Sequence, residues 1–434
     1  MIGDIKMEIY GHIIKFERLK QNMKQVTLAE GICQPSYLSR IENNSIVPSE
    51  EVLGKLFKKL NIEKSTMEIP ESKFIDYVKM NYKEAILYKD RAKTSLLLKE
   101  LNQKLYVFPD LTDFYNHQLI LLRLNLISHD IQFPTKEIMR ALSELKENFN
   151  VHQQFTFHIN LGFLKFFENE LDSSLESFQK ALNFLPNIKC EDWEIADMEY
   201  ALGLVYAMSK RYVSSIEYTK RSITFFEKHL YYSRSIEAYI VLSIAYKYSQ
   251  KYDEASELLK IAQNIAQKTN HTENLLQLHY NIGAIDTLQG NSKSALFNYQ
   301  ACITLSNEDW NTATSMIALI IEYAKQQNHA AVIEWCKKGL TLCNNSTDPL
   351  TKIKEPHFYC FLTIYGELDD YEIPLIKGIK IFEQQEDFRF AHKYCLQLAH
   401  YYMENKKYKK AALQYKKANE YLALKENRKY IEDL

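Results

Sequence analysis

One short pattern recurs at intervals of about 40 residues, and it constrains the fold more than any other feature of the chain. The pattern is a step of one apolar and one small residue, at Leu161-Gly162, Leu202-Gly203, Leu242-Ser243, Ile282-Gly283 and again at Leu398-Ala399. A second small residue follows each step, at Ser174, Ser215, Ala255, Ala295 and Ala411. Small residues at fixed positions let helices approach closely, so this period predicts stacked helix pairs.

Composition favours the same all-α architecture. The 434 residues include only 11 glycines and 9 prolines, too few for the many tight turns of a β-sandwich or barrel. Hydrophobic residues make up 46 %, which is enough for a large core. The repeating units from residue 73 onward resemble tetratricopeptide repeats. They predict a right-handed superhelix of about nine helix pairs, with the first helix of each pair lining a concave groove.

Residues Gln25 to Glu42 carry a different, local pattern. Two short helical segments meet there at the tight turn Gly31-Ile32-Cys33. The second segment begins near Gln34, with Pro35 at the first helical position, where a missing N–H costs nothing. The apolar residues expected in its small core are Ile32, Leu38 and Ile41. Ser49 then predicts the capped start of another helix.

This stretch resembles the helix-turn-helix of the phage-repressor-like (Xre/Cro) DNA-binding family over about residues 8–62. Lys24-Gln25-Val26 stand where the commonest family pattern has Leu-Thr-Gln. The resemblance implies a recognition helix in the major groove. Carried over by position, it implies DNA contacts from Gln25, Gln34, Pro35, Ser36, Tyr37 and Arg40. Pairing of Arg40 with Glu42 or Glu17 is the structural alternative.

The two patterns divide the chain into a helix-turn-helix domain at 1–64, a linker at 65–72 and a repeat domain at 73–434. The linker carries Pro70 and small polar residues, and it predicts a hinge between the two domains. The first domain has a net charge of only +2, weak electrostatics for a single DNA-binding module. Because two such domains would roughly double the phosphate contacts, we expect a homodimer formed through the repeat domain.

The concave groove supplies the expected ligand surface. Repeat geometry turns several positions around each step inward, and many of these positions are aromatic. The expected peptide-binding residues are Asn160, Phe163, Phe167, Tyr200, Leu204, Lys247, Tyr248, Tyr280, Asn281 and Ala284. Asn160 and Asn281 each offer a donor and an acceptor to an extended peptide backbone. For each residue taken alone, packing or hydrogen bonding between neighbouring helices is the alternative role.

The combination of a repressor-like domain with tetratricopeptide-like repeats resembles the RNPP group (Rap, NprR, PlcR and PrgX), peptide-sensing regulators of Gram-positive bacteria. Gln25–Ser49, with Ile32-Cys33 in the turn, looks closest to the PlcR type. The resemblance implies a quorum-sensing transcription regulator whose promoter binding is controlled by a short signalling peptide in the groove. The alternative is a Rap-like protein that binds a response regulator, as a phosphatase or by sequestering it. Its available polar residues are Glu71, Asp76, Glu84 and Gln103.

The sequence contains no recognisable motif for catalysis, a cofactor or a metal ion. Seven cysteines are scattered without a C-x-x-C motif, and no Cys/His cluster has zinc-ligand spacing. Glycine-rich phosphate loops and Ser-His-Asp or Cys-His arrangements are also missing. The N-terminus lacks a signal-peptide core, and no apolar run approaches membrane-spanning length. We therefore expect a cytoplasmic protein that is not an enzyme and uses no cofactor, metal or membrane.

Overall fold

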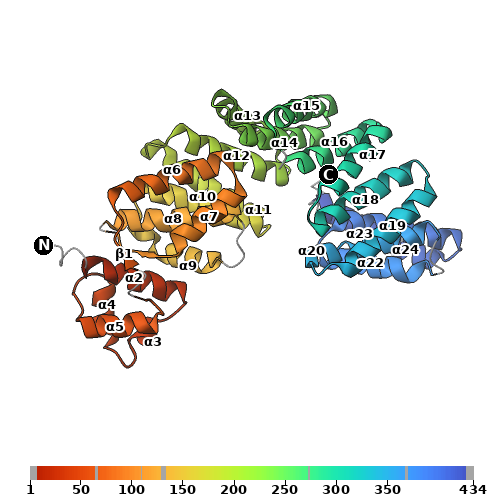
Figure 1. The fold of residues 1–434 in the computed structure, drawn as a ribbon. Helices are drawn as coiled ribbons and strands as arrows, with labels where there is room; N and C mark the ends of the chain where they lie inside the picture. The colour runs from red at the N-terminus through yellow and green to blue at the C-terminus, as the bar shows by residue number, and fades with distance from the viewer. Residues whose placement is uncertain are drawn as a thin grey trace. The chain divides into compact units, whose positions relative to one another are not determined.

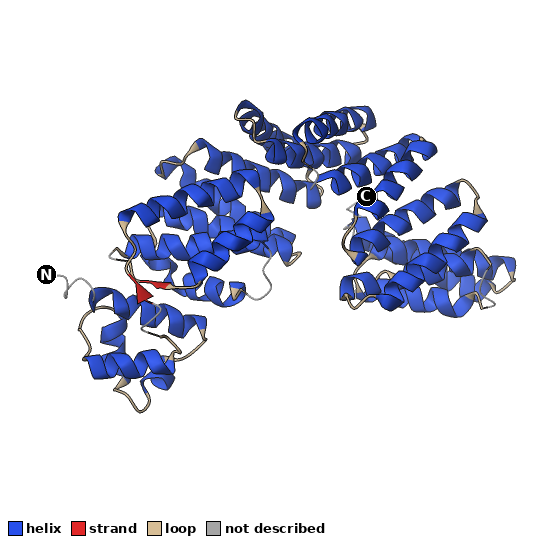
Figure 2. Ribbon diagram, viewed as in Figure 1, coloured by secondary structure: helices blue, strands red, loops and turns tan. Residues whose placement is uncertain are grey.

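The computed structural model describes residues 7–63, 67–108, 110–128, 133–271, 274–366 and 370–426, with the side chains of 7–9, 425 and 426 left out. These residues are almost entirely helical (Figure 1; Figure 2), as an all-α fold class predicts. The chain divides into two compact units, residues 1–271 and 272–434. Within the described ranges, no helix is long and apolar enough to cross a membrane.

The head, residues 7–63, consists of four helices around a small apolar core. They are α2 (Met7–Lys20), α3 (Gln25–Ala29), α4 (Pro35–Glu42) and α5 (Glu50–Lys59). Leu38 and Ile41 are buried in this core, and Ile32 packs at its edge. Pro35 occupies the first position of α4, and Ser49 Oγ accepts a hydrogen bond from the backbone N–H of Val52. The predicted core and both predicted helix starts are thus confirmed.

The segment after the head is tied to the repeats by a short parallel ladder. Strand β1 (Met67–Glu68) pairs with strand β2 (Leu105–Tyr106), and the Glu68 carboxylate pairs with the Lys104 ammonium. Met67 and Glu68 of the predicted linker at 65–72 thus belong to this ladder, and residues 64–66 lie outside the described residues; the hinge stays a prediction. Proline and small polar residues suit a fixed corner between a strand and a helix as well as a hinge, so composition alone could not separate the two.

In the part of the chain that the structure describes, nine helix pairs follow, which confirms the prediction of about nine; the first helix of each pair is called A and the second B. Unit 1 contains α6 (Ser72–Tyr88) with α7 (Arg91–Asn102), α8 (Leu111–Ser128) with α9 (Thr135–Leu145), α10 (Val151–Phe167) with α11 (Leu171–Phe184), α12 (Asp192–Met208) with α13 (Tyr212–Lys228), and α14 (Tyr232–Tyr248) with α15 (Tyr252–Thr269). Unit 2 contains α16 (Leu275–Gln289) with α17 (Ser292–Leu305), α18 (Asp309–Lys325) with α19 (His329–Asn345), α21 (Glu355–Ile364) with α22 (Glu372–Gln384), and α23 (Phe388–Glu404) with α24 (Tyr408–Glu426). Short turns η2 (Lys146–Asn148), η3 (Leu185–Asn187) and α20 (Pro349–Lys352) interrupt the series.

The recurring step is where the A and B helices of a pair touch. A Cβ added to Gly162 would lie 2.8 Å from the ring of Phe178, and one added to Gly283 would lie 2.8 Å from the ring of Tyr299. The second small residue closes the same contact in α11, where Ser174 Oγ donates a hydrogen bond of 2.7 Å to the Gly162 carbonyl. The small residues are therefore required by close approach of the helices, as the sequence period predicted.

Candidate functional site

The exposed face of α4 carries most of the residues expected to contact DNA. Gln34, Pro35, Ser36 and Arg40 are all exposed, whereas Tyr37 is half-buried and packs against the head core. Leu38 and Ile41 anchor the opposite face of the same helix. A short helix held by its apolar side and open on its polar side has the geometry needed to enter a major groove.

A buried ion pair, which the sequence did not predict, fixes α4 against α2. Arg18 donates to both carboxylate oxygens of Glu42, over 2.6 and 2.8 Å, and also to the Met23 carbonyl. Glu42 is completely buried and accepts a further hydrogen bond of 2.7 Å from Gln25 Nε2. The amide N–H₂ of Gln25 is thus engaged within the head, so this side chain organises the helix-turn-helix as well as lying near its expected DNA face.

The structural alternative considered for Arg40 does not occur in this structure. Glu42 is bound by Arg18 as described, and Glu17 pairs with Lys20 over 3.2 Å. Arg40 lies exposed in the last turn of α4. Its guanidinium is available for a phosphate or a base edge.

The head is docked on unit 1 through α2. Phe16 of α2 is 2 % exposed, and its ring meets the ring of Phe114 at the start of α8, with centroids 5.5 Å apart and an interplanar angle of 88°. Arg140 of α9 donates to the carbonyl oxygens of Leu19 and Lys20, over 3.4 and 2.8 Å, at the carboxyl end of α2. Since this contact uses α2, it leaves Gln34, Ser36 and Arg40 exposed.

The A helices α8, α10, α12 and α14 of unit 1 form what we call the A-helix wall. Its clearest feature is a row of exposed apolar side chains six residues after successive steps. Phe167, Met208 and Tyr248 hold this position on α10, α12 and α14, with exposed fractions of 49, 50 and 54 %. Lys247 Nζ lies 4.7 Å from the centroid of the Tyr248 ring, and Leu204 is half-buried on α12. Because equivalent positions of stacked repeats lie on the same face, these three side chains are a candidate binding surface.

The backbone clamp expected at Asn160 is not supported by the structure. Asn160 is completely buried, and its Nδ2 donates a hydrogen bond of 2.9 Å to the Leu119 carbonyl of α8. The alternative role, bonding between neighbouring helices, is therefore the one observed. Phe163 and Tyr200 are also buried, each beneath a guanidinium: that of Arg123 lies 3.6 Å from the first ring and that of Arg234 4.3 Å from the second.

These two arginines belong to an ionic network that crosses the wall. Asp197 of α12 accepts from Arg123 of α8 over 2.6 Å and from Arg234 of α14 over 2.8 Å. Although burial alone would raise the pKa of Asp197, the two guanidinium groups hold it below its usual value. Glu237 lies 3.5 Å from Arg234 and 2.9 Å from Lys89. No sequence motif marks this network, because its members come from four separate helices or helix ends.

Helix α6 packs against the amino-terminal parts of three wall helices, α8, α12 and α14. Besides the Lys89–Glu237 pair, Lys83 binds Glu191 over 2.6 Å, and the ring of Tyr82 meets that of Trp193 at 5.9 Å. Burial lowers the pKa of Lys89 to about 8, although Glu237 opposes the shift. The exposed row at Phe167, Met208 and Tyr248 lies at the other ends of these helices, which α6 leaves open.

The remaining three expected peptide-binding residues belong to unit 2. Tyr280 is half-buried and meets Tyr299 edge to face at 6.0 Å. Asn281 is half-buried, and its Nδ2 donates to the Gln277 carbonyl of its own helix over 2.8 Å. Ala284 is also half-buried.

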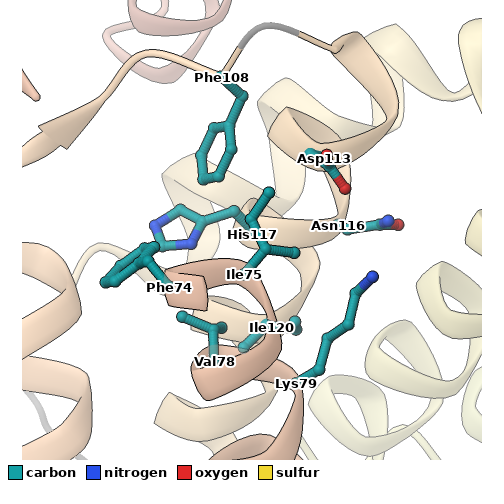
Figure 3. A pocket seen from close by; sticks show the side chains of 9 residues that line it. All are labelled: Phe74, Ile75, Val78, Lys79, Phe108, Asp113, Asn116, His117 and Ile120. Atoms are coloured by element: carbon teal, nitrogen blue, oxygen red, sulfur yellow. The ribbon is translucent and has the colours of Figure 1, made fainter. Parts of the chain in front are cut away.

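A pocket lies between α6 and α8 in unit 1, away from the exposed row. Figure 3 shows an apolar floor with the polar ends of Lys79, Asp113 and Asn116 toward one side; the full lining is Phe74, Ile75, Val78, Lys79, Phe108, Asp113, Asn116, His117 and Ile120. Burial lowers the pKa of His117 to about 4, so the ring is neutral at pH 7. The pocket includes none of the residues expected to bind DNA or peptide.

The head and the nine helix pairs together define a helix-turn-helix protein with a helical-repeat body, and comparison with known proteins supports this class. Residues 14–65 match the helix-turn-helix family model HTH_3. The chain is 27 % identical over 408 residues to the transcriptional activator NprA of Geobacillus stearothermophilus, covering 91 % of this chain and 98 % of that protein.

Several solved structures share the fold, among them those of NprR and a Rap protein. The apo form of the quorum sensor NprR from B. thuringiensis has a TM-score of 0.67 at 14 % identity, covering 81 % of this chain and 99 % of NprR. A Rap protein complexed with Competence and Sporulation Factor has a TM-score of 0.64 at 15 % identity, covering 82 % and 100 %. The chain is thus similar over nearly its whole length to a transcriptional activator, and it shares its fold with NprR and a Rap protein, which agrees with the resemblance to the RNPP group.

Proposed function

We propose that this protein binds promoter DNA through α4 and is controlled by a short signalling peptide bound along the A-helix wall. The observation that carries the proposal is the exposed row at Phe167, Met208 and Tyr248, which repeats on three consecutive A helices of unit 1. A ligand that spans three equivalent positions must be extended, and an extended peptide presents side chains at regular intervals. We also propose that the protein is cytoplasmic, is not an enzyme and needs no cofactor.

Related proteins support a peptide as the ligand. NprR has been solved in complex with its cognate peptide NprX, and it shares the fold of this chain with a TM-score of 0.57 at 14 % identity. The aromatic and apolar side chains of the row suit a mainly apolar peptide, and Lys247 beside Tyr248 adds a cation for a carboxylate. Tyr200, Leu204 and Phe163 support the row from within the wall. Tyr280, Asn281 and Ala284 lie on α16 of unit 2 and stay predictions.

Helix α8 offers a physical connection between the wall and the head. Its first turn carries Phe114, which packs on Phe16 of the head; further along, its Leu119 carbonyl binds Asn160, and its Arg123 binds Asp197. We propose that a peptide that prefers one arrangement of α10, α12 and α14 shifts α8 and thereby the placement of the head. Such a population shift requires only that the peptide bind one arrangement more tightly than the other.

For the head, we propose DNA contacts from Gln34, Pro35, Ser36 and Arg40, with Gln25 and Tyr37 also holding the helix-turn-helix together. We keep the division into a DNA-binding domain at 1–64, a connection at 65–72 and a repeat domain at 73–434. A homodimer formed through the repeat domain would present two heads to two half-sites. The low net charge of a single head supports this assembly, because each added phosphate contact strengthens binding.

The peptide site is tested by a charge placed in the exposed row. Met208→Glu should weaken binding of short peptides encoded beside the gene by about 100-fold, measured by fluorescence anisotropy on the full-length protein, because a carboxylate must be desolvated against an apolar ligand. Val213→Glu is the matched control, since Val213 is 83 % exposed on the B helix α13. Equal peptide affinity in the two variants would remove the row from the site.

The coupling between peptide binding and DNA binding is tested at the contact between Phe114 of α8 and Phe16 of the head. Phe114→Ala changes the body side of the contact and leaves the head sequence intact. It should keep peptide binding while abolishing the effect of the peptide on promoter affinity. Gln34→Ala with Ser36→Ala should instead weaken specific DNA binding about 10-fold or more, with or without peptide. DNA binding that never responds to peptide in the wild type would favour a protein partner, such as a response regulator, for the repeat domain.

A further inference from the structure

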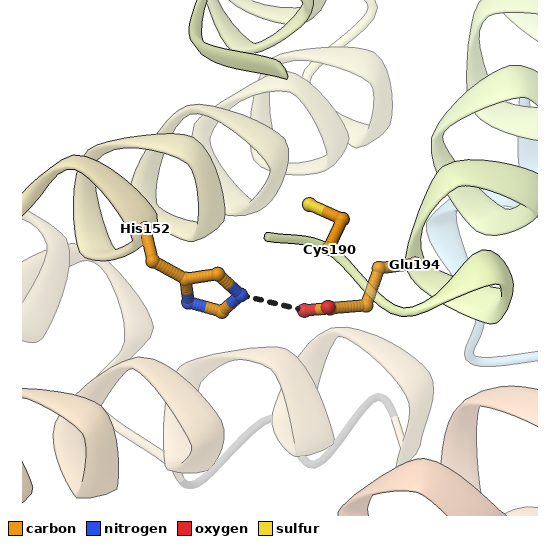
Figure 4. A group of neighbouring side chains, drawn as sticks. All are labelled: His152, Cys190 and Glu194. Atoms are coloured by element: carbon orange, nitrogen blue, oxygen red, sulfur yellow. Dashed lines mark hydrogen bonds and ion pairs between the residues drawn. The ribbon is translucent and has the colours of Figure 1, made fainter. Parts of the chain in front are cut away.

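Three side chains that commonly bind metal ions come together at the junction of α10 and α12, although they are far apart in the sequence. His152 lies in the first turn of α10, Cys190 in the loop before α12, and Glu194 in the first turn of α12. Figure 4 shows His152 hydrogen-bonded to Glu194 with Cys190 beside the pair. The distance between His152 Nε2 and Glu194 Oε1 is 3.0 Å, and one ligand atom from each residue lies within 4.8 Å of the other two.

We propose that His152, Cys190 and Glu194 bind a zinc ion, which would tie α10 to the loop that begins α12. A tetrahedral zinc ion places its ligand atoms roughly 3.3–3.8 Å apart, given bond lengths of about 2.0–2.3 Å. The present separations need adjustments of about 1 Å to reach that geometry. The set mixes nitrogen, sulfur and oxygen, which zinc accepts, whereas calcium and magnesium bind almost entirely through oxygen.

The carboxylate is already oriented for this role. Glu194 Oε2 accepts a hydrogen bond of 2.9 Å from the backbone N–H of Glu191, in a capping box at the start of α12. This contact holds the second oxygen, Oε1, toward His152. A ligand whose other oxygen is fixed by the backbone loses little freedom when it binds a metal ion.

Charge and access also fit zinc. A thiolate, a carboxylate and a neutral imidazole give a charge of −2, which balances a divalent cation. Zinc removes the proton from a thiol that it coordinates, so Cys190 would bind as the thiolate. The His152 side chain is 43 % exposed, which gives an ion a path from solvent and leaves a position for a water molecule.

No pattern in the sequence predicts this site. His152 and Cys190 are separated by more than a complete helix, and their spacing matches no zinc motif, which led to the expectation of no metal. The site does not depend on the proposed peptide or DNA binding. A bound ion would connect α10 with the loop before α12, beside the ion pair between Lys83 of α6 and Glu191.

The test is titration of chelator-treated, full-length protein with Co²⁺, which reports a cysteine ligand through an intense thiolate-to-cobalt absorption band. We expect one equivalent of Co²⁺ to produce the band and Zn²⁺ to remove it by displacement. Cys190→Ser should abolish the band, whereas Cys33→Ser, a change at the other partly buried cysteine, should leave it intact. Glu194→Gln keeps an acceptor for the capping box and should weaken Co²⁺ binding by roughly 100-fold.

The proposal fails if stoichiometric Co²⁺ gives no thiolate band, or if the band persists in Cys190→Ser. Circular dichroism of each variant establishes that it is folded. If Cys190→Ser does not fold, the Glu194→Gln titration decides: unchanged Co²⁺ affinity there overturns the site, and weakened affinity with the band retained supports it.

Discussion

Units 1 and 2 follow the same repeat but bury different side-chain chemistry. In unit 1, Asp197 lies between the guanidinium groups of Arg123 and Arg234, from three different helices. The described part of unit 2 instead buries five cysteines among aliphatic and aromatic side chains, and its buried acids Asp286 and Glu322 accept hydrogen bonds from serine hydroxyls. The small residues that close each pair are common to both units, so pair packing does not dictate what lies between the pairs.

This difference assigns different roles to the two units. Desolvated ions bind strongly only when their geometry is correct, so the network of unit 1 selects one arrangement of α8, α12 and α14. The packing of apolar side chains and thiols in unit 2 stabilises the fold without requiring the precise geometry of a buried ion pair. The head is attached to unit 1, where Phe114 and Arg123 lie on the same helix. The proposed peptide signal therefore has its most specific route to the head through unit 1.

The largest effect should come from breaking the network of unit 1. Asp197→Asn leaves two buried arginines without their shared counter-ion, and we expect it to lower the free energy of unfolding by about 3–5 kcal/mol. The exposed pair Glu334–Lys338 of unit 2 is the contrast: Glu334→Gln should cost less than about 1 kcal/mol. Urea unfolding measures both, and hydrogen exchange should locate the loss in α8, α12 and α14. Similar costs for the two variants would contradict the comparison.

The next largest effect should be the pH dependence of the free energy of unfolding. Unit 1 and unit 2 should both contribute to it in the same direction. Burial lowers the pKa of His117 to about 4 and that of His357, in unit 2, to about 3. Because the unfolded chain takes up these protons first, near pH 6.5, stability is full above that pH and falls as the pH drops toward the folded pKa. The loss is about 1.4 kcal/mol per pH unit, or about 3 kcal/mol for His117 by pH 4.

Replacing the ring isolates the contribution of His117. His117→Leu should flatten the pH dependence of the free energy of unfolding between pH 6.5 and 4, measured by urea unfolding at several pH values. His357→Leu should remove a second, separate part of this pH dependence. The double variant should therefore show the weakest pH dependence of the three. An unchanged slope in His117→Leu would mean that this ring is solvated or protonated in the folded protein.

The smallest effect concerns the packing that both units share. Gly162→Ala in unit 1 and Gly283→Ala in unit 2 each place a methyl group 2.8 Å from an aromatic ring, and each should cost about 1–3 kcal/mol. Gly54→Ala in α5 meets no atom within 4 Å and should be neutral or stabilising by about 0.5–1 kcal/mol. Thermal unfolding of the three variants is the measurement. A tolerated alanine at Gly283 alone would show that the units differ in packing as well as in charge.

The sequence predicted the exposed face of α4 more completely than it predicted the A-helix wall. The exposed face of α4 followed from local signals: the proline and serine at two helix starts, and apolar residues at helical spacing. The sequence predicted the peptide-binding residues as one group, but in the structure some of them are exposed and others are buried. Phe167 and Tyr248 are exposed, while Asn160 is buried and bound to Leu119. A period places residues on the same face of a helix, but it does not say how far α6 or a neighbouring A helix covers that face.

The sequence by itself determined the all-α class, the helix-turn-helix, the nine pairs and the close contacts at the small residues. All of these depend on residues within one helix or one adjacent pair, where spacing along the chain equals spacing in the structure. Only the tertiary structure decided the docking of Phe16 on Phe114, the network around Asp197, and the meeting of His152, Cys190 and Glu194. Their partners come from elements separated by whole helices, and side chains brought together by stacking leave no regular interval in the sequence.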